Sequence, residues 1–424
     1  MISRAIIAPA IALLLAASAS AAPVDEHQHL GVASCATGVC HGKLSPQPDS
    51  NVWLNEYRIW SADDRHARAY QTLLTPESQR IAAKLGLANA QTASICLDCH
   101  ADNVPAAQRG AKFQLSDGVG CEACHGGAER WIESHTEPDA SHPANLDRGM
   151  LATEDIGVRA QVCLACHLGT RDQFATHRIM GAGHPRLSFE LEAYTANQPA
   201  HYEVDDDYRA RKGAPTGFDV WRAGQVESTR RFLDLIESQL FGTGVPDFAF
   251  FDCHSCHHPM DDLRWPEVRR RQGLEPGALR LQDQHLFMLT AMAGVLAPGE
   301  RQRLGELQVA MLRAGQTSVA AVRAAAAELK GWLDQRAWTS APVSREQAAA
   351  IRSAIAQAGA RGDLADYAAA EQAFLGIESL SFYLGDADRL QSALDALFSA
   401  VESDRDFDPR KARAAMERLS RELQ

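Results

Sequence analysis

The feature that most constrains this 424-residue chain is a cysteine–cysteine–histidine pattern that occurs five times. All ten cysteines belong to the pattern, and a histidine directly follows the second cysteine of every pair. Four pairs have two residues between the cysteines, whereas the first pair has four. Only 16 of the 424 residues are histidines, so five such neighbours are not a chance result. The five groups are Cys35/Cys40/His41, Cys96/Cys99/His100, Cys121/Cys124/His125, Cys163/Cys166/His167 and Cys253/Cys256/His257.

Two cysteines, a two-residue spacer and a histidine form the pattern of covalent c-type haem attachment. The two thiols add to the two vinyl groups of the porphyrin, and the next imidazole falls beneath the iron as its proximal ligand. The pattern therefore predicts five covalently bound haem c groups. We expect the ten cysteines to attach them and the five histidines that follow to bind iron.

Zinc sites and disulfides are the alternative interpretations of these cysteines. Zinc sites use cysteine pairs, but five adjacent histidines supply more ligands than closed tetrahedral sites need. Disulfides are common in exported chains, but they leave the five histidines unexplained. The haem interpretation accounts for both residue types.

The first motif, Cys35-Ala-Thr-Gly-Val-Cys40-His41, has a spacer that is two residues longer than the others. Taken alone, it is also compatible with a disulfide beside an unrelated histidine. Two extra residues can loop outward while the thiols keep their separation, and His41 still follows directly. We therefore interpret this motif as a fifth attachment site.

Five irons need up to five further ligands on their opposite faces, and eleven histidines lie outside the five motifs. Small neighbours leave room for a haem beside His66, and Gly181 and Gly183 permit a close backbone approach beside His184. The predicted distal ligands are His66, His135, His177, His184 and His285. Weaker candidates are His27, His29, His201 and His258, whereas His142 and His254 are expected to be bystanders.

The first 22 residues have the order of a secretory signal peptide. Arg4 precedes an apolar run over residues 5–17, and small residues fill positions 19–22. This run is short for a bilayer span. We expect cleavage near residue 21 or 22, export to the periplasm, and no membrane span in the mature chain. Without Arg4 the chain has 41 basic and 54 acidic residues, a net charge of −13, which argues against a nucleic-acid partner.

The remaining chain divides into two predicted domains, residues 23–272 and 273–424, and the predicted fold class is mostly α. The first has little hydrophobic periodicity, so we expect short helices around stacked haems that replace a conventional core. The second contains no cysteine and has helical periodicity, which predicts an antiparallel bundle of roughly five to six helices. Predicted helix starts are a capping box at residues 344–347, a cap at Asp363 and a cap at Asp408 before Pro409.

From about Cys35 to His167, the sequence resembles the cytochrome c554 family, which is related to hydroxylamine oxidoreductase and pentahaem nitrite reductase. The resemblance is carried by "GVGCEACHGG…ESH" (118–135), by "DRHARAY" (64–70) and by the order of the motifs. It implies that His66 and His135 are distal ligands of haems other than their sequence neighbours. It also implies that the haem at Cys96 lacks a sixth protein ligand. The long first spacer, the motif at Cys253 and the helical region after it depart from the family pattern.

The leading hypothesis for function is a periplasmic electron carrier with closely packed haems that each have two histidine ligands. Its expected partners are other cytochromes or a membrane quinol-oxidising or reductase complex. The alternative is a multihaem oxidoreductase with one five-coordinate haem that acts on nitrite, hydroxylamine, nitric oxide or tetrathionate. A third possibility, compatible with the first, is an assembly role in which the helical region docks the cytochrome onto a partner.

Overall fold

The computed structural model describes residues 26–46, 53–242, 244–258, 273–336, 338 and 342–424. Within these residues the fold is mostly α-helical, as predicted, and extended pairing is limited to two isolated bridges, His29 with Arg109 and Phe251 with Leu281. None of the helices in these ranges is both long enough and apolar enough to cross a membrane. The predicted signal peptide lies outside the described residues.

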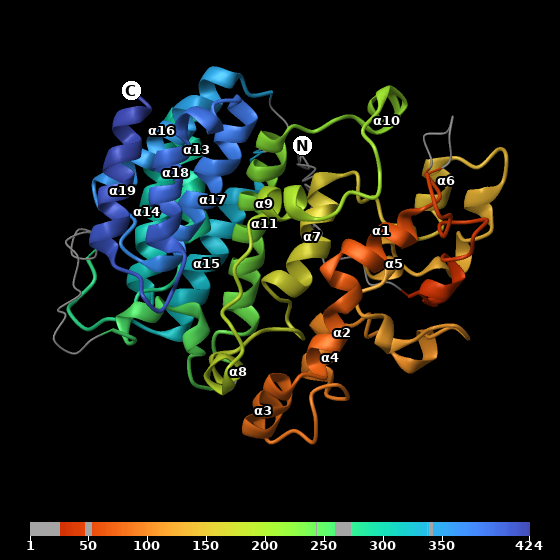
Figure 1. Ribbon diagram of the computed structural model, residues 1–424. Coiled ribbons are helices and arrows are strands. Elements are labelled where there is room, and N and C mark those ends of the chain that lie inside the picture. The colour runs from red at the N-terminus through yellow and green to blue at the C-terminus, as the bar shows by residue number, and fades with distance from the viewer. Residues whose placement is uncertain (1–25, 47–52, 243, 259–272, 337, 339–341) are drawn as a thin grey trace, which may run out of the picture.

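Short helices joined by long loops make up the N-terminal half (Figure 1). Their ends follow ordinary helix chemistry. The α3 helix, for example, begins with Thr75 as its cap and Pro76 at its first position, and it ends at Gly86 in the left-handed conformation. These helices are α1 (Glu56–Asp63), α2 (Ala69–Leu73), α3 (Pro76–Leu85), α4 (Ser94–His100), α5 (Cys121–His125), α6 (His142–Leu146), α7 (Ile156–His167), α8 (His177–Ala182), α9 (Leu191–Asn197) and α10 (Asp206–Lys212).

Long helices packed side by side form the C-terminal bundle (Figure 1). The described part of residues 273–424 contains seven helices rather than five or six. Breaks as short as one or two residues, at Ala297 and at Gly385–Asp386, separate neighbouring helices. The bundle helices are α11 (Gly217–Ser238), α13 (Gln284–Leu296), α14 (Pro298–Ala314), α15 (Val319–Asp334), α16 (Arg345–Ala360), α17 (Tyr367–Leu384), α18 (Ala387–Val401) and α19 (Pro409–Glu422).

Two of the three predicted helix starts in the bundle are confirmed. Ser344 and Gln347 form the capping box of α16, and Asp408 accepts a hydrogen bond at the start of α19. The cap predicted at Asp363 is wrong, because Asp366 caps α17 and accepts a 2.8 Å hydrogen bond from the backbone of Ala369. The backbone N–H of Asp363 instead donates to Ala358 O in the preceding turn.

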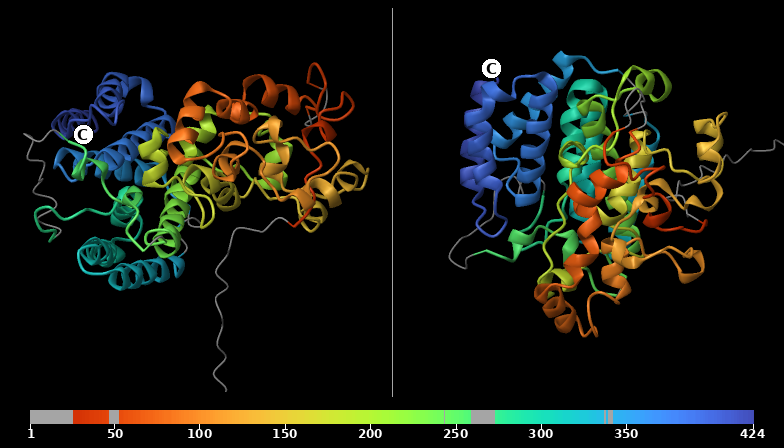
Figure 2. Two further views of the ribbon diagram at one scale, coloured as in Figure 1. Left: turned by 90° about the horizontal axis from the view of Figure 1, so that it is seen from below. Right: turned by 45° about the vertical axis from the view of Figure 1, so that its right-hand side comes forward.

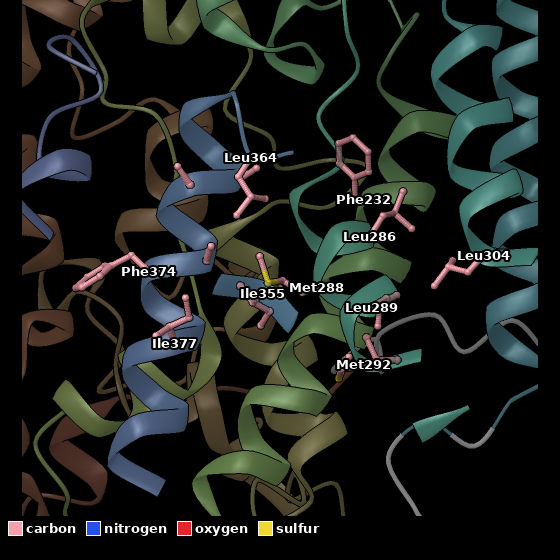
Figure 3. Close-up of a cluster of buried hydrophobic side chains, with 14 of the residues drawn as sticks. Phe232, Leu286, Met288, Leu289, Met292, Leu304, Ile355, Leu364, Phe374 and Ile377 are labelled. Carbon is pink, nitrogen blue, oxygen red and sulfur yellow. The ribbon is translucent and has the colours of Figure 1, made fainter. Parts of the chain in front are cut away.

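A single hydrophobic core joins α11 to the helices of the C-terminal region. Figure 3 shows Phe232 of α11 with Met288 of α13, Ile355 of α16 and Ile377 of α17. Trp221 of α11 is fully buried in this core. The core therefore extends N-terminally beyond the predicted boundary at residues 272/273, and the fifth motif lies between two helices of the bundle, α11 and α13.

The segment that leads into α9 connects the two halves of the molecule, and α7 and α9 lie beside α11 in both sets of views (Figures 1 and 2). Gln372 donates a 2.9 Å hydrogen bond to the carbonyl of Phe189. The hydroxyl of Ser379 donates a 3.3 Å hydrogen bond to Glu190, which caps α9. Burial raises the pKa of Glu190 to about 7.

Gly376 in α17 tests how closely this core is packed. A Cβ atom there would lie 2.8 Å from Nε1 of the fully buried Trp221, whereas a Cβ at Gly331 in α15 would meet nothing within 4 Å. We predict that Gly376→Ala lowers the free energy of unfolding by about 1–3 kcal/mol. The matched Gly331→Ala should raise it by up to about 1 kcal/mol. Denaturant unfolding followed by circular dichroism measures both, and equal effects would contradict the close packing.

Glu190 gives a prediction for the pH dependence of stability. Its pKa in the folded chain, about 7, lies above the value of about 4.3 expected when unfolded. The neutral carboxyl therefore stabilises the fold fully below pH 4.3, and this contribution is lost as the pH rises to 7. The melting temperature of Glu190→Gln relative to the parent protein should rise across this window and level off above it. The same difference in melting temperature between variant and parent at pH 5 and at pH 8 would contradict this.

Candidate functional site

Each histidine that ends a cysteine motif faces a second histidine from another segment of the chain. The ring centres within a pair are 6.2 or 6.3 Å apart in all five cases, and no histidine belongs to two pairs. The five pairs are His41–His135, His100–His184, His125–His201, His167–His66 and His257–His177.

The spacing within these pairs is too long for direct ring contact, but it suits two imidazoles on one metal ion. A metal–imidazole bond is about 2.0–2.1 Å long, and the nitrogen lies about 1.1 Å from its ring centre. Two such rings on opposite sides of one ion therefore have centres roughly 6.3 Å apart. The side chains fit five irons that each have two axial histidines.

The relative orientation of the two ring planes distinguishes the pairs. The planes of His41 and His135 are nearly parallel, with an angle of 9° between them. Three other pairs are close to perpendicular, with angles of 80–90°. The His177–His257 pair is intermediate, at 38°. Axial ring orientation sets the splitting of the iron d orbitals, so the first site should be spectroscopically distinct from its neighbours.

A turn of helix places the thiols and the histidine of a regular motif on one side. The helices α4, α5 and α7 all end at their motif histidine. In the fifth motif the backbone N–H of His257 donates a 2.8 Å hydrogen bond to Cys253 O, which closes the turn.

The fifth motif differs from the other four in its exposure, which the sequence pattern did not predict. Cys256 is exposed, whereas the other nine cysteines are partly buried, and His257 is exposed as well. The physical reason is local, because the 3-10 turn Cys253–Ser255 ends one residue before Cys256, whose backbone (φ −125°) leaves the helical conformation. Cys256 therefore differs from the other nine cysteines, which are partly buried. Its assignment to haem attachment stays a prediction, supported by the motif and by the His257–His177 pair.

The first motif retains the same closing hydrogen bond despite its longer spacer. The N–H of His41 donates to Cys35 O at 3.0 Å. The extra residues bulge outward, and Val39 is 83% exposed. Gly42 allows the chain to leave this loop, because a Cβ there would lie only 2.0 Å from Ala36 O. The geometry of this loop thus favours a fifth attachment site.

Thiols of different motifs lie close together. Those of Cys35 and Cys121 are in hydrogen-bond contact, as are those of Cys99 and Cys166. The Nε2 atom of Gln173 lies 3.2 Å from Sγ of Cys99 and 3.1 Å from Sγ of Cys166. The first motif is therefore adjacent to the third, and the second motif is adjacent to the fourth.

The third and fourth motifs are also neighbours, because the thiols of Cys124 and Cys163 interact electrostatically. Burial raises the pKa of Cys124 to about 12 and that of Cys163 to about 11. All ten cysteines are free in the described chain. Nor do the described residues bring together three Cys, His, Asp or Glu side chains in the way that a zinc site requires.

Burial keeps several of the paired imidazoles in the neutral form that binds a metal. It lowers the pKa of His125 and of His167 to about 4, and it also lowers the pKa of His100 and His201. His41 differs, because its hydrogen bond to Glu56 raises its pKa.

In several paired histidines the Nδ1 atom, which points away from the partner ring, is held by a hydrogen bond. This leaves Nε2 to face the partner ring. Two of them bond to carboxylates: Nδ1 of His41 lies 2.8 Å from Oε2 of Glu56, and Nδ1 of His66 lies 2.8 Å from Oδ1 of Asp64. Burial opposes the ionisation of Asp64, but hydrogen bonds from His66 and Gln198 outweigh it and lower the pKa of Asp64 to about 2.

Backbone carbonyls hold other paired histidines at the same position. His100 bonds to Ala69 O at 3.2 Å, His135 to Trp131 O at 3.2 Å, and His184 to Pro185 O at 2.8 Å. The hydrogen-bond partner at Nδ1 therefore differs in charge from one site to the next.

Nine of the ten histidines predicted to bind iron belong to the five pairs. The tenth, His285 in α13, is buried in the bundle, where its Nδ1 lies 2.9 Å from Oε1 of Gln225. The structure instead brings His201 to His125. His201 lies in a loop whose path no local pattern encodes, whereas His285 stood out only as the single histidine of its region.

The expected bystanders contact other groups: His142 bonds to Glu154, and His254 bonds to Asp404 O.

Turns that carry paired thiols and end in histidines, each facing a second histidine at metal-bridging distance, are the arrangement expected of a c-type cytochrome. A family model described as "Cytochrome c554 and c-prime" matches residues 26–126, which include the first three motifs. This N-terminal part of the chain is therefore similar to the cytochrome c554 family. No curated protein and no solved structure matches the chain.

The choice between His201 and His285 is directly testable. We predict that His201→Ala leaves one iron with a single protein ligand, which adds a high-spin absorption feature and allows carbon monoxide to bind the reduced protein. The control variant His285→Ala should remain entirely low-spin, because this side chain bonds to Gln225. Absorption spectra of the reduced proteins with and without carbon monoxide decide the matter. The opposite pattern would show that His285 is the ligand.

Proposed function

We propose that this protein is a pentahaem electron-transfer cytochrome in which every haem has two axial histidines. The observation that carries the proposal is the presence of five separate histidine pairs with ring centres 6.2–6.3 Å apart. Two protein ligands leave an iron no open position for a substrate, so such a site exchanges electrons and does not bind small molecules. The haems supply the one-electron chemistry, and the chain attaches, orients and shields them.

Each proposed haem combines one cysteine pair, the histidine that follows it and one distal histidine. In motif order, the distal ligands are His135, His184, His201, His66 and His177. His66 and His135 serve motifs other than their sequence neighbours, as the family resemblance implies.

Contacts between motifs support an order of electron transfer. The Cys35–Cys121 contact links the first site to the third, the third and fourth are linked through Cys124 and Cys163, and the Cys99–Cys166 contact links the fourth to the second. We therefore propose the sequence first, third, fourth, second.

The fifth site joins this series through the segment around α8. Gln173 lies against the thiols of the second and fourth motifs, His177 at the start of α8 faces His257, and His184 just after α8 faces His100. A single short helix thus carries a ligand of the fifth site and leads directly to a ligand of the second. We place the fifth site next to the second.

The helical bundle has a proposed role in holding the fifth motif. Asp252 donates its backbone N–H to Arg280 O at 2.8 Å, and His254 bonds to Asp404 O at 2.9 Å. Asp247 accepts a 2.9 Å hydrogen bond from the backbone of His177. Both sides of the fifth site are therefore tied to the bundle or to the loop after α11. Docking of the bundle onto a partner protein is compatible with this role.

The alternative, an oxidoreductase with an open haem at Cys96, has less support. The family resemblance points to that haem, but His184 faces His100 at 6.3 Å, the same spacing as in the other pairs. Activity on nitrite, hydroxylamine, nitric oxide or tetrathionate would require one of these pairs to open.

The sequence also supports a proposal for the location and the partners of the protein. The signal-peptide pattern in residues 1–22 and the need of c-type haems for thiol chemistry outside the cytoplasm support a periplasmic location. We propose that the partners are redox proteins, either other cytochromes or a membrane quinol-oxidising or reductase complex. The net charge, −12 for the full chain and −13 without Arg4, does not favour nucleic acid.

The proposal predicts five haems per chain and only low-spin iron. Intact mass and the pyridine haemochrome assay should both give five, and the reduced protein should not bind carbon monoxide. Replacement of Cys35 and Cys40 by serine should reduce the count to four, which tests the long-spacer motif separately. A count of four in the parent protein that this replacement leaves unchanged would show that the first motif does not attach a haem. A native high-spin haem that binds nitrite or hydroxylamine would favour the oxidoreductase alternative.

A further inference from the structure

Two of the five proposed sites have a carboxylate on the outer nitrogen of an iron-binding histidine. Glu56 lies 2.8 Å from Nδ1 of His41 at the first site, and Asp64 lies 2.8 Å from Nδ1 of His66 at the fourth. Both carboxylates are largely shielded from solvent, with 19% and 5% of their side chains exposed. The carboxylate of each pair is therefore held away from most of the solvent, whereas the His41 and His66 side chains are 33% and 37% exposed.

Both carboxylates are fixed in place by other hydrogen bonds. Oε1 of Glu56 accepts a 3.0 Å bond from the backbone of Leu54. Oδ1 of Asp64 also accepts a 2.9 Å bond from the backbone of His66, and its Oδ2 accepts a 3.0 Å bond from Gln198. These contacts orient the carboxylates toward the histidines, so neither is a mobile surface group that meets a ring by chance.

The second site has a different environment, because neutral carbonyls occupy this position on both of its histidines. Nδ1 of His100 bonds to Ala69 O, and Nδ1 of His184 bonds to Pro185 O. At the third site, His201 is hydrogen-bonded to the backbone of Pro199. The carboxylates therefore alternate with carbonyls along the proposed order first, third, fourth, second.

We propose that Glu56 and Asp64 are tuning residues that lower the reduction potentials of the first and fourth haems below that of the second. This inference rests on the proposed function, since it assumes that His41 and His66 bind iron. A hydrogen bond to a carboxylate gives the imidazole partial negative charge, which strengthens its donation to the metal. The added negative charge stabilises the oxidised iron relative to the reduced iron, so the potential falls.

The proposed potentials have a consequence for where electrons reside. With low-potential sites at the first and fourth positions, electrons that enter the series collect at the second site, next to the fifth. Partial reduction should therefore reduce the second haem before the first and fourth. The protein would hold electrons at the α8 side of the molecule rather than at the first motif.

The test uses Glu56→Gln and Asp64→Asn in the full-length holoprotein. Both replacements keep the shape and an oxygen acceptor but remove the charge. Glu154→Gln is the comparison variant. Glu154 forms the same kind of pair with His142, which faces none of the five motif histidines in the described structure, and its charge acts on His125 of the third site. The readout is a potentiometric titration followed by electron paramagnetic resonance.

The ring-plane angles allow the affected haem to be identified in that titration. The nearly parallel rings of His41 and His135 predict an ordinary rhombic low-spin signal for the first site. The perpendicular rings of His66 and His167 predict a signal with a large maximum g value for the fourth. Glu56→Gln should raise the midpoint of the rhombic signal, and Asp64→Asn should raise the midpoint of one large-g signal. We expect at least a tenfold change in the equilibrium constant for reduction in each case, which is about 59 mV for one electron.

The outcomes separate this inference from the proposed function. Unchanged midpoints in both variants, with five low-spin haems retained, overturn the tuning role and leave the pentahaem proposal intact. A shift of similar size in the midpoint of the rhombic signal in Glu154→Gln also overturns it, because it would show a general effect of charge on the first haem. Fewer than five low-spin haems in the parent protein count against the proposed function itself. If Glu56→Gln does not assemble, Glu56→Asp, which withdraws the carboxylate by one methylene, must raise the same midpoint.

Discussion

The N-terminal half of this protein depends on one geometric constraint, the 6.2–6.3 Å separation between paired histidine rings. Each pair joins segments that are distant in the sequence, such as the first motif and the loop at His135. Short helices with few large apolar side chains cannot bury enough surface to stay folded alone. In the proposed holoprotein, covalent attachment fixes one face of each haem and the distal histidine fixes the other. The cofactors therefore act as cross-links and as the core.

The C-terminal half is stabilised in the ordinary way, by burial of apolar side chains between long helices. The α11 helix connects the two modes of stabilisation, because it packs on α7 and α9 on one side and on α13, α15 and α17 on the other. The fifth motif lies in the loop region between α11 and α13. Its position is consequently set by the bundle core as well as by its own ligands. The proposed electron-transfer part and the helical bundle are thus packed against each other through α11.

Local patterns in the sequence predicted some features correctly and failed to predict others. The capping box at Ser344 and the cap at Asp408 were correct, because a cap depends on residues within one helical turn. Asp363 was wrong as a cap, because the helix begins three residues later, where Asp366 accepts a hydrogen bond from the backbone of Ala369, and the sequence does not rank the two. The motif pattern also could not distinguish the exposed Cys256 from the nine partly buried cysteines, because all five motifs have the same residue types. The predicted domain boundary fell at the change in composition, but the hydrophobic core also includes α11.

By itself, the sequence determined which residues are predicted to attach cofactors and which histidine accompanies each cysteine pair, since these groups are adjacent and their spacing carries the chemistry. It also determined the mostly α-helical fold class and the presence of a helical C-terminal region. Only the tertiary structure decided which distal histidine faces which motif, and it placed His201 at His125 and His285 beside Gln225. It also decided which of these histidines bond to a carboxylate and which to a carbonyl. The physical reason is that these contacts join residues far apart in the chain, so they depend on how loops cross in space and leave no local pattern.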